Sequence, residues 1–349
     1  MPEATSRESD CWEDNSMSTR TGRKAHGDCS GGRGGVRGSG MLLTAEATAA
    51  SPGRDLGRLP AGTVAVTKLR AELAGVWQEI GEAGDPLADP EAVHRLRVAT
   101  RRSLAALAAF APLVSPRNRR RFQRRLRRVR RAAGEARDLD VLIDRLRQQW
   151  PTTGEDPLVN SPPERLIGLL SDQQIGSRGP IRDCQAELLA WEWPVRQEQF
   201  LTTIGLGSQK RYGEFARKRL RRLGRRFFAT AGPFRKAEQL HQFRILGKRL
   251  RYSLDLFADV LAPQPRKRCL KRLKKIQEAL GDFTDHAAAA DRLTDLTRES
   301  LDPATILLVD TLRREERQLA RLAHRRFDSW WTTGRRKKLR TLFRDALQS

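Results

Sequence analysis

Two histidines, each heading a matching run of cationic residues, carry the clearest chemistry in this sequence. The runs read HRLRVATRR from His94 and HQFRILGKR from His241, 147 residues later, and both fit H-x-x-R-x-x-x-[KR]-R. On a helix, the histidine and the cations three and seven residues after it share one side. Arginine matches phosphate oxygens with a planar fork, lysine adds a point charge, and histidine donates from its ring. The pattern therefore predicts a helix face that binds a polyanion.

The same offset of 147 residues relates positions well beyond the two motifs. The matching pairs are Phe110 and Phe257, Pro116 and Pro263, Leu126 and Leu273, Gly134 and Gly281, and Asp138 and Asp285. An internal repeat of this kind indicates that one structural unit occurs twice in the chain.

A second row of cations follows each motif. The rows are Arg120, Arg124, Arg127, Arg128 and Arg131 in the first copy and Lys267, Lys271, Lys274 and Lys275 in the second. Like charges four residues apart cost a helix about 0.2–0.5 kcal/mol per pair, and a bound polyanion would remove that cost. The ordinary alternative is a solvated charged face, but few acidic residues lie four positions away and the row recurs in both copies, which favours a binding surface.

The two rows of each copy give one candidate set for polyanion binding. Its members are His94, Arg97, Arg101, Arg102, Arg124, Arg127, Arg128, His241, Arg244, Lys248, Arg249, Arg251, Lys271, Lys274 and Lys275.

The elements that position these residues are all predicted to be helices, because apolar residues recur at helical spacing and strand-like alternation is absent. Asp89 followed by Pro90 is a typical helix start, whereas Gly134 and Gly281 are expected to end helices and Asp138 and Asp285 to begin new ones. In chain order, we expect helices at about 62–83, 90–111, 117–133, 138–149, 163–174, 181–200 (broken at Pro194), 209–230, 236–260, 266–280, 285–298, 304–327 and 329–347. The fold class is therefore all-α, with two similar helical bundles.

The composition limits the domain organisation and the partner. The chain has 349 residues and a formal net charge of +25, so an acidic partner such as nucleic acid, an anionic membrane or an inorganic polyanion is expected. Aromatic residues make up only 6%, which disfavours binding by base stacking. Residues 1–60 are Gly-, Ser- and Arg-rich and are predicted to be a disordered tail in which either Met1 or Met41 could begin translation. The remaining 61–349 form one domain with halves at 62–208 and 209–349.

Several other classes of function find no support in the sequence. The four cysteines fit neither a disulfide framework nor a zinc site, which favours a reduced, cytoplasmic location. We find no signal peptide, no apolar run of about 20 residues, no phosphate-binding loop and no nucleophile–base set. Asp138, Asp140, Asp282 and Asp285 are expected to cap helices or bind arginine rather than a metal. We therefore expect no enzyme activity, cofactor or metal. The sequence does not indicate an oligomeric state.

The histidine motifs resemble those of the CHAD family, the conserved histidine α-helical domain. VHRLRVATRR from Val93 and LHQFRILGKRLRY from Leu240 are similar to the two signatures of the family, and GEARDLDV from Gly134 and ALGDFTD from Ala279 are similar to the segments that follow. The resemblance covers about 62–349. It implies two bundles related by a pseudo-two-fold axis, a central basic pore or cleft that binds inorganic polyphosphate, and association with polyphosphate granules. The family often has arginine where this chain has Leu104, whereas the second copy keeps it as Arg251.

Three hypotheses for the function follow. The first is a polyphosphate-binding module. The second is a nucleic-acid-binding protein that uses the same basic helices, and the third is a regulated polyphosphate enzyme. Both kinds of polyanion would bind with strong salt dependence, so competition between polyphosphate and DNA is the discriminating measurement.

Overall fold

The structure, a computed structural model, describes residues 56–150, 161–205, 210–232, 234, 237–298 and 301–348. The disorder predicted for the tail, and the choice of start codon, fall almost wholly outside these residues. The first described element begins at Leu56, a few residues before the predicted start of the domain at 61. In chain order the elements are η1 Leu56–Arg58, α1 Ala61–Ala83, α2 Pro90–Ala109, η2 Ala111–Leu113, α3 Pro116–Gln149, α4 Pro162–Gly176, α5 Gly179–Ala190, α6 Trp193–Thr202, α7 Tyr212–Ala229, α8 Ala237–Leu256, η3 Ala258–Val260, α9 Pro263–Leu296, α10 Pro303–Trp330 and α11 Thr333–Ala346.

The described residues contain no strand, which confirms the predicted all-α class. The one β-type contact among them is an isolated bridge between Pro60 and Arg211. The predicted start of α2 is confirmed, since Asp89 accepts a hydrogen bond from the Glu91 backbone at 2.7 Å and Pro90 occupies the first turn.

The helices that carry the cation rows have matching lengths. α2 and α8 both have 20 residues, α3 and α9 both have 34, and a 3₁₀ turn follows each of α2 and α8. Both long helices begin with a proline in their first turn, at Pro116 and Pro263. These starting residues are separated by the same 147 positions as the two histidines.

The prediction that glycines end two of the helices is wrong. Gly134 lies inside α3 and Gly281 inside α9, so that Asp138 and Asp285 are interior helical residues rather than N-caps. An interior glycine costs a helix about 0.5–1 kcal/mol relative to alanine. Around Gly134 this cost is offset by Ala132, Ala133 and Ala136, which are strong helix formers and are buried.

The break between α5 and α6 lies at Trp191 and Glu192, and not at Pro194 as predicted. Glu192 has φ of 55°, a left-handed conformation that costs about 1–2 kcal/mol for a side chain of this type. Pro194 instead lies in the first turn of α6, where its missing N–H is harmless. The corner places Trp191 against α3, where its ring packs edge-on to Phe122 with centroids 5.0 Å apart.

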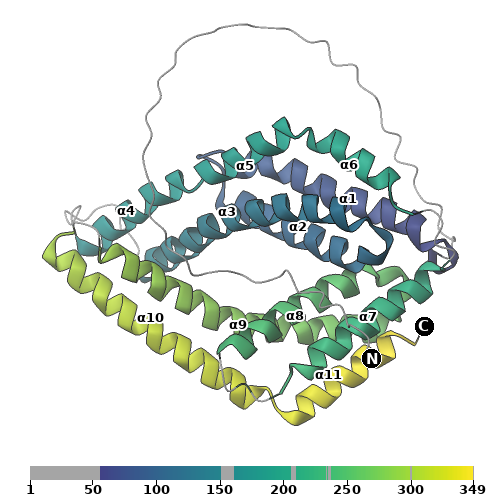
Figure 1. The fold of residues 1–349 in the computed structure, drawn as a ribbon. Coiled ribbons are helices and arrows are strands. Elements are labelled where there is room, and N and C mark those ends of the chain that lie inside the picture. The colour runs from purple at the N-terminus through teal and green to yellow at the C-terminus, as the bar shows by residue number, and fades with distance from the viewer. Residues whose placement is uncertain are drawn as a thin grey trace, which may run out of the picture. The chain divides into compact units, whose positions relative to one another are not determined.

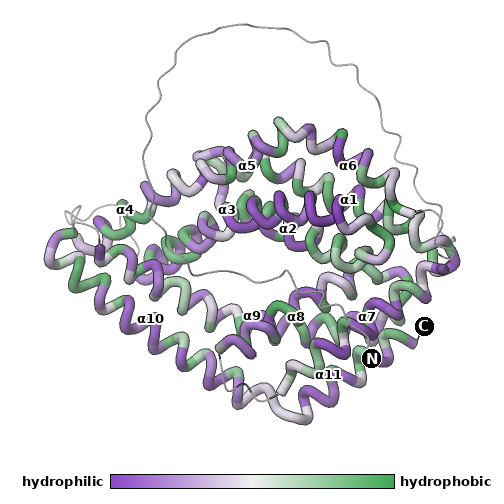
Figure 2. The backbone as a smooth tube through the Cα atoms, in the orientation of Figure 1, coloured by the Kyte–Doolittle hydropathy of each residue, from purple (hydrophilic) through white to green (hydrophobic). Residues whose placement is uncertain are grey.

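The helices pack as two groups (Figure 1). In the first helix group, α1–α6, α2 lies between α1 and α3, while α4 and α5 pack on α3. In the second helix group, α7–α11, α8 packs on α7 and α9, and α9 also contacts α10 and α11. Hydrophobic and hydrophilic residues alternate along these helices, as α10 shows most clearly (Figure 2). Each helix thus has an apolar side to bury.

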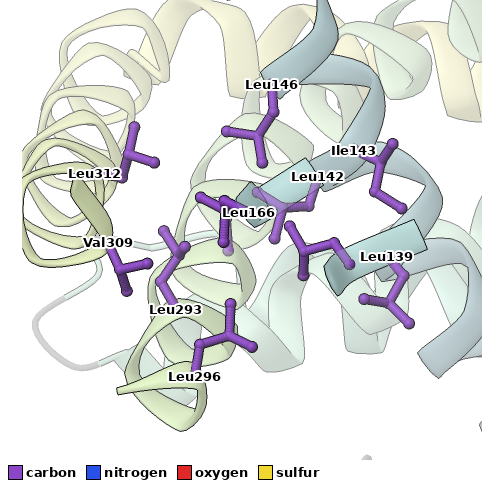
Figure 3. Close-up of a cluster of buried hydrophobic side chains, with 11 residues drawn as sticks. Leu139, Leu142, Ile143, Leu146, Leu166, Leu293, Leu296, Val309 and Leu312 are labelled. Atoms are coloured by element: carbon purple, nitrogen blue, oxygen red, sulfur yellow. The ribbon is translucent and has the colours of Figure 1, made fainter. Parts of the chain in front are cut away.

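A shared apolar cluster joins the two helix groups (Figure 3). Its members come from α3 and α4 in the first group and α9 and α10 in the second. They are Leu139, Leu142, Ile143, Leu146, Leu166, Leu170, Ala289, Leu293, Leu296, Val309 and Leu312. At its edge Arg165 makes a two-pronged ion pair with Asp302, the N-cap of α10, at 3.0 Å for each bond. The groups also meet where α2 contacts α8.

Candidate functional site

The cations of α2 are crowded against the middle of α3. Arg97 is mostly buried and donates to the Gly134 carbonyl at 3.4 Å and to Asp138 at 3.3 Å. Burial lowers the pKa of the Arg97 guanidinium, and the nearby Arg101 lowers it further. Asp138 opposes this shift, but Arg101 and Arg137 leave an excess of positive charge around Arg97 that a further anion would offset.

His94 lies in the same cationic environment at the exposed start of α2. Burial lowers the pKa of its imidazole, and although Glu91 opposes this, the charges of Arg137, Arg97 and Arg101 lower it further. His94, Arg97 and Arg101 thus act electrostatically on one another, and Arg137 of α3 belongs to the same group.

Arg102 lies on the flank of α2 and already has an anionic partner. Its guanidinium holds the carboxylate of Glu72 on α1 with bonds of 3.0 and 3.1 Å, which raise the pKa of Arg102. Asp255 and Tyr252 of α8 also act electrostatically on it, so this flank is where the two helix groups approach each other.

The cations of α8 belong to the second helix group, across the contact between α2 and α8. His241, Arg244, Lys248 and Arg249 are all half-buried. Arg251 stacks its guanidinium over the ring of Tyr252, 4.6 Å from the centroid. Its Nε is buried and makes no hydrogen bond within the described part of the chain. Burial raises the pKa of the adjacent Asp255 carboxyl, and Arg251, Arg266 and Arg102 oppose that effect.

The cations of the long helices are more exposed. Arg124 and Arg128 of α3 are exposed and Arg127 is half-buried. Arg128 is ion-paired with Glu187 of α5. In α9, Lys271, Lys274 and Lys275 are all exposed, and Lys274 lies 3.6 Å from Glu278 one turn later. Some members of the predicted set are thus paired with carboxylates, Arg128 on another helix and Lys274 on its own.

The aspartates around α3 bind arginine side chains. Asp138 pairs with Arg97, as above. Asp140 is buried, accepts from Gln174 at 2.7 Å and lies 3.5 Å from the buried Arg178. Burial raises the pKa of the Asp140 carboxyl, although these donors oppose the shift. No group of three potential metal ligands occurs among the described residues.

Sequence reasoning missed four arginines that the structure brings next to predicted ones. A helix that ends at Gly134 does not include Arg137. In the continuous helix α3, Arg137 lies ten residues, nearly three turns, after Arg127. Arg121, Arg125 and Arg196 line a pocket together with Arg124. Arg196 lies on α6, and only the fold brings it to α3.

The described helices include none that is long and apolar enough to cross a membrane. Two described cysteines, Cys184 and Cys269, are buried and form no disulfide.

Comparison with protein families and solved structures shows which known proteins this chain resembles. The sequence model of the CHAD domain matches residues 65–294. No curated protein sequence matches the chain. Among solved structures, the CHAD domain from the plant Ricinus communis is similar, with a TM-score of 0.61, 21% identity, and coverage of 76% of this chain and 88% of that one. PptA from Streptomyces chartreusis has a TM-score of 0.53 and 17% identity, and the match covers 78% of this chain and 99% of PptA. At these identities the solved structures support the fold, and the family match covers well over half of the chain. The chain belongs to the CHAD domain family.

Proposed function

We propose that this protein binds inorganic polyphosphate between the cationic sides of α2 and α8. The observation that carries the proposal is the crowding of His94, Arg97, Arg101 and Arg137, where burial and mutual repulsion lower the pKa of His94 and of Arg97. A chain of phosphates would offset that repulsion and accept hydrogen bonds from the same groups.

The second part of the proposal is that both helix groups contribute to one site. The equal lengths of α2 and α8, and of α3 and α9, support two copies of one unit related by a pseudo-two-fold axis. In this arrangement a central basic pore or cleft would be lined by His94, Arg97 and Arg101 from one copy and by His241, Arg244, Lys248, Arg249 and Arg251 from the other. Arg127, Lys271 and Lys275 would extend it along α3 and α9.

Cations that already hold carboxylates should contribute less. Arg102 with Glu72, Arg128 with Glu187 and Lys274 with Glu278 would have to exchange a carboxylate for a phosphate. Arg97 also lies 3.3 Å from Asp138, but Arg101 and Arg137 leave this pair in an excess of positive charge. Exposed ion pairs contribute about 0–1 kcal/mol, so replacing the carboxylate by a phosphate costs little but also adds little to the binding free energy.

We further propose binding without chemical turnover, and association with polyphosphate granules in the cell. Nucleic acid is the alternative ligand, because the net charge of +25 favours any polyanion. Its weakness is that the paired tryptophans at the end of α10 offer little surface for base stacking: Trp331 is buried, and Trp330 packs on it with ring centroids 6.0 Å apart.

A competition titration separates the two ligands. Labelled duplex DNA bound to the protein is titrated with long-chain polyphosphate at matched phosphate concentration, and the reverse displacement is then measured. We expect polyphosphate to displace DNA and DNA to leave bound polyphosphate in place. The opposite ranking would assign the protein to nucleic acid. Release of phosphate by the pure protein with Mg²⁺ would contradict the proposal of binding without turnover.

A further inference from the structure

A second cationic site lies on the first helix group, where α3 faces the corner between α5 and α6. A pocket of about 330 Å³ opens there, near the lower end of the range of about 300–1,000 Å³ for small-molecule sites. Its lining residues are Arg121, Arg124, Arg125, Trp191 and Arg196. No carboxylate lines the pocket, so its walls favour an anion.

Arg125 is held in a fixed orientation at this pocket. Its guanidinium lies over the ring of Trp191, 3.6 Å from the centroid, and donates to the Arg121 carbonyl at 3.4 Å. Trp191 is itself wedged against the rings of Phe122 and Trp193, with centroids 5.0 and 5.9 Å away. A guanidinium restrained in this way loses little further freedom when an oxyanion binds, which is the basis of preorganised recognition.

The arginines that α3 contributes to this pocket have no direct carboxylate partner among the described residues. Neither Arg121, Arg124 nor Arg125 forms an ion pair with a carboxylate in the described part of the chain. Burial lowers the pKa of the Arg125 guanidinium, and the charges of Arg124, Arg121 and Arg128 lower it further, while Glu187 opposes the shift. An anion in the pocket would relieve this repulsion.

Two carboxylates close to these arginines are already paired. Glu187 pairs with Arg128, and Glu192 accepts from Arg196 at 3.3 Å. Arg196 also donates to Gln199 at 3.3 Å. Because these carboxylates are paired with Arg128 and Arg196, the excess positive charge at the pocket comes from the arginines of α3.

The lining selects the class of ligand. Because Arg125 covers a face of Trp191 and Phe122 contacts its edge, a nucleobase cannot use that face for stacking. Several guanidiniums around a small volume instead match oxygens on adjacent phosphorus atoms. We propose that this pocket binds a short inorganic phosphoanion with two or more linked phosphoryl groups, such as pyrophosphate. The site is separate from the α2 and α8 cations and does not rest on the function proposed for them.

The second helix group offers a matched control. Arg268 and Arg272 of α9 lie 147 positions after Arg121 and Arg125. Within the described residues, Arg272 has no stacked aromatic ring. Removing either pair deletes the same charge from an equivalent helix, but only the first pair belongs to the pocket.

The test is calorimetric titration with pyrophosphate, with tryptophan emission as a second readout. Arg121→Ala with Arg125→Ala should weaken pyrophosphate binding about tenfold or more, and Arg268→Ala with Arg272→Ala should stay within about twofold of the unaltered protein. Trp191→Leu keeps every arginine but removes the support of Arg125, and should cost about threefold. It provides a separate test if the double variant folds poorly by circular dichroism.

Other outcomes would overturn the proposal. These are no pyrophosphate binding by the unaltered protein, equal losses in the two double variants, or ADP binding about tenfold tighter than pyrophosphate with the same arginine dependence. His241→Ala with Arg244→Ala and Lys248→Ala should leave pyrophosphate binding intact, and its loss would place that anion at α8 instead. If long-chain polyphosphate displaces pyrophosphate, the pocket binds phosphoryl groups within a longer chain. If it does not, the pocket binds a free, short phosphoanion.

Discussion

The two helix groups share two pairs of helices of equal length, α2 with α8 and α3 with α9, but place their cations differently. In the first group position 104 is a buried leucine, where the second group has Arg251 stacked on Tyr252. In the other direction, the first group has Arg137 beside His94, where the position 147 residues later is Thr284. Each group therefore has a cation that the other lacks.

This difference shows that the two sides of a proposed shared site need not bind equally. The cations of α2 are concentrated near α3, where burial and repulsion act on His94 and Arg97. The cations of α8 extend further along the helix, to Arg251. We expect the second group to contribute more to the total affinity, and the first group to give binding most of its pH dependence.

The largest expected effect concerns the cluster that holds the groups together. Leu293→Ala should lower the free energy of unfolding by about 2–5 kcal/mol, because Leu293 is fully buried among residues of both groups. Urea unfolding measures this, with the exposed Leu189→Ala as control, for which a change within about 0.5 kcal/mol is expected. Two separate unfolding transitions in the unaltered protein would show that the groups do not depend on each other.

The next effect compares the two cation sets directly. His241→Ala with Arg244→Ala and Lys248→Ala should weaken long-chain polyphosphate binding about tenfold or more, which is about 1.4 kcal/mol. His94→Ala with Arg97→Ala and Arg101→Ala should cost less, about three- to tenfold. Both affinities come from the same titration, with unchanged helicity by circular dichroism as the control. If the α8 triple variant binds normally, its three residues do not belong to the site.

Single substitutions that erase the difference should have smaller effects. Arg251→Leu gives the second group the residue type of position 104, and Arg137→Thr gives the first group that of position 284. Each should weaken polyphosphate binding about threefold. Arg314→Ala on α10 removes the same charge from a helix that contacts neither α2 nor α8 strongly, and should bind normally. An equal loss in this control would mean that only net charge matters.

The smallest effect is the pH dependence that His94 contributes. Because its pKa in the folded protein is below the ordinary 6.5, the unfolded chain takes up the proton first as the pH falls through 6.5, and unliganded stability declines there. Bound phosphate favours the protonated ring, so polyphosphate affinity should rise between about pH 8 and about pH 6. His94→Gln should flatten both profiles, and unchanged profiles would show that His94 does not titrate in contact with the ligand.

Local sequence rules predicted the helices well where capping residues and apolar spacing agreed. The start of α2 at Asp89 and Pro90 follows from such local chemistry, whereas α9 begins at Pro263, three residues before the predicted start at 266. The ends predicted at Gly134 and Gly281 were wrong because packing of the surrounding alanines and leucines outweighs the intrinsic cost of one glycine.

The site was harder to predict than the helices, because ion pairs form between distant residues. Arg102 and Glu72 are separated by 30 positions and Arg128 and Glu187 by 59, so no helical spacing rule reveals them. The pocket at Trp191 depends on the left-handed Glu192, a conformation that side-chain type does not predict. The histidine motifs were readable because their cations lie on one helix each, at spacings fixed by helix geometry.

We propose that both helix groups bind the same polyphosphate chain. The most direct test is a calorimetric titration of long-chain polyphosphate into the unaltered protein and into the two triple variants. We expect one high-affinity binding step in the unaltered protein, and we expect each triple variant to weaken that same step. Two independent steps, with each variant losing one and keeping the other at full affinity, would contradict it.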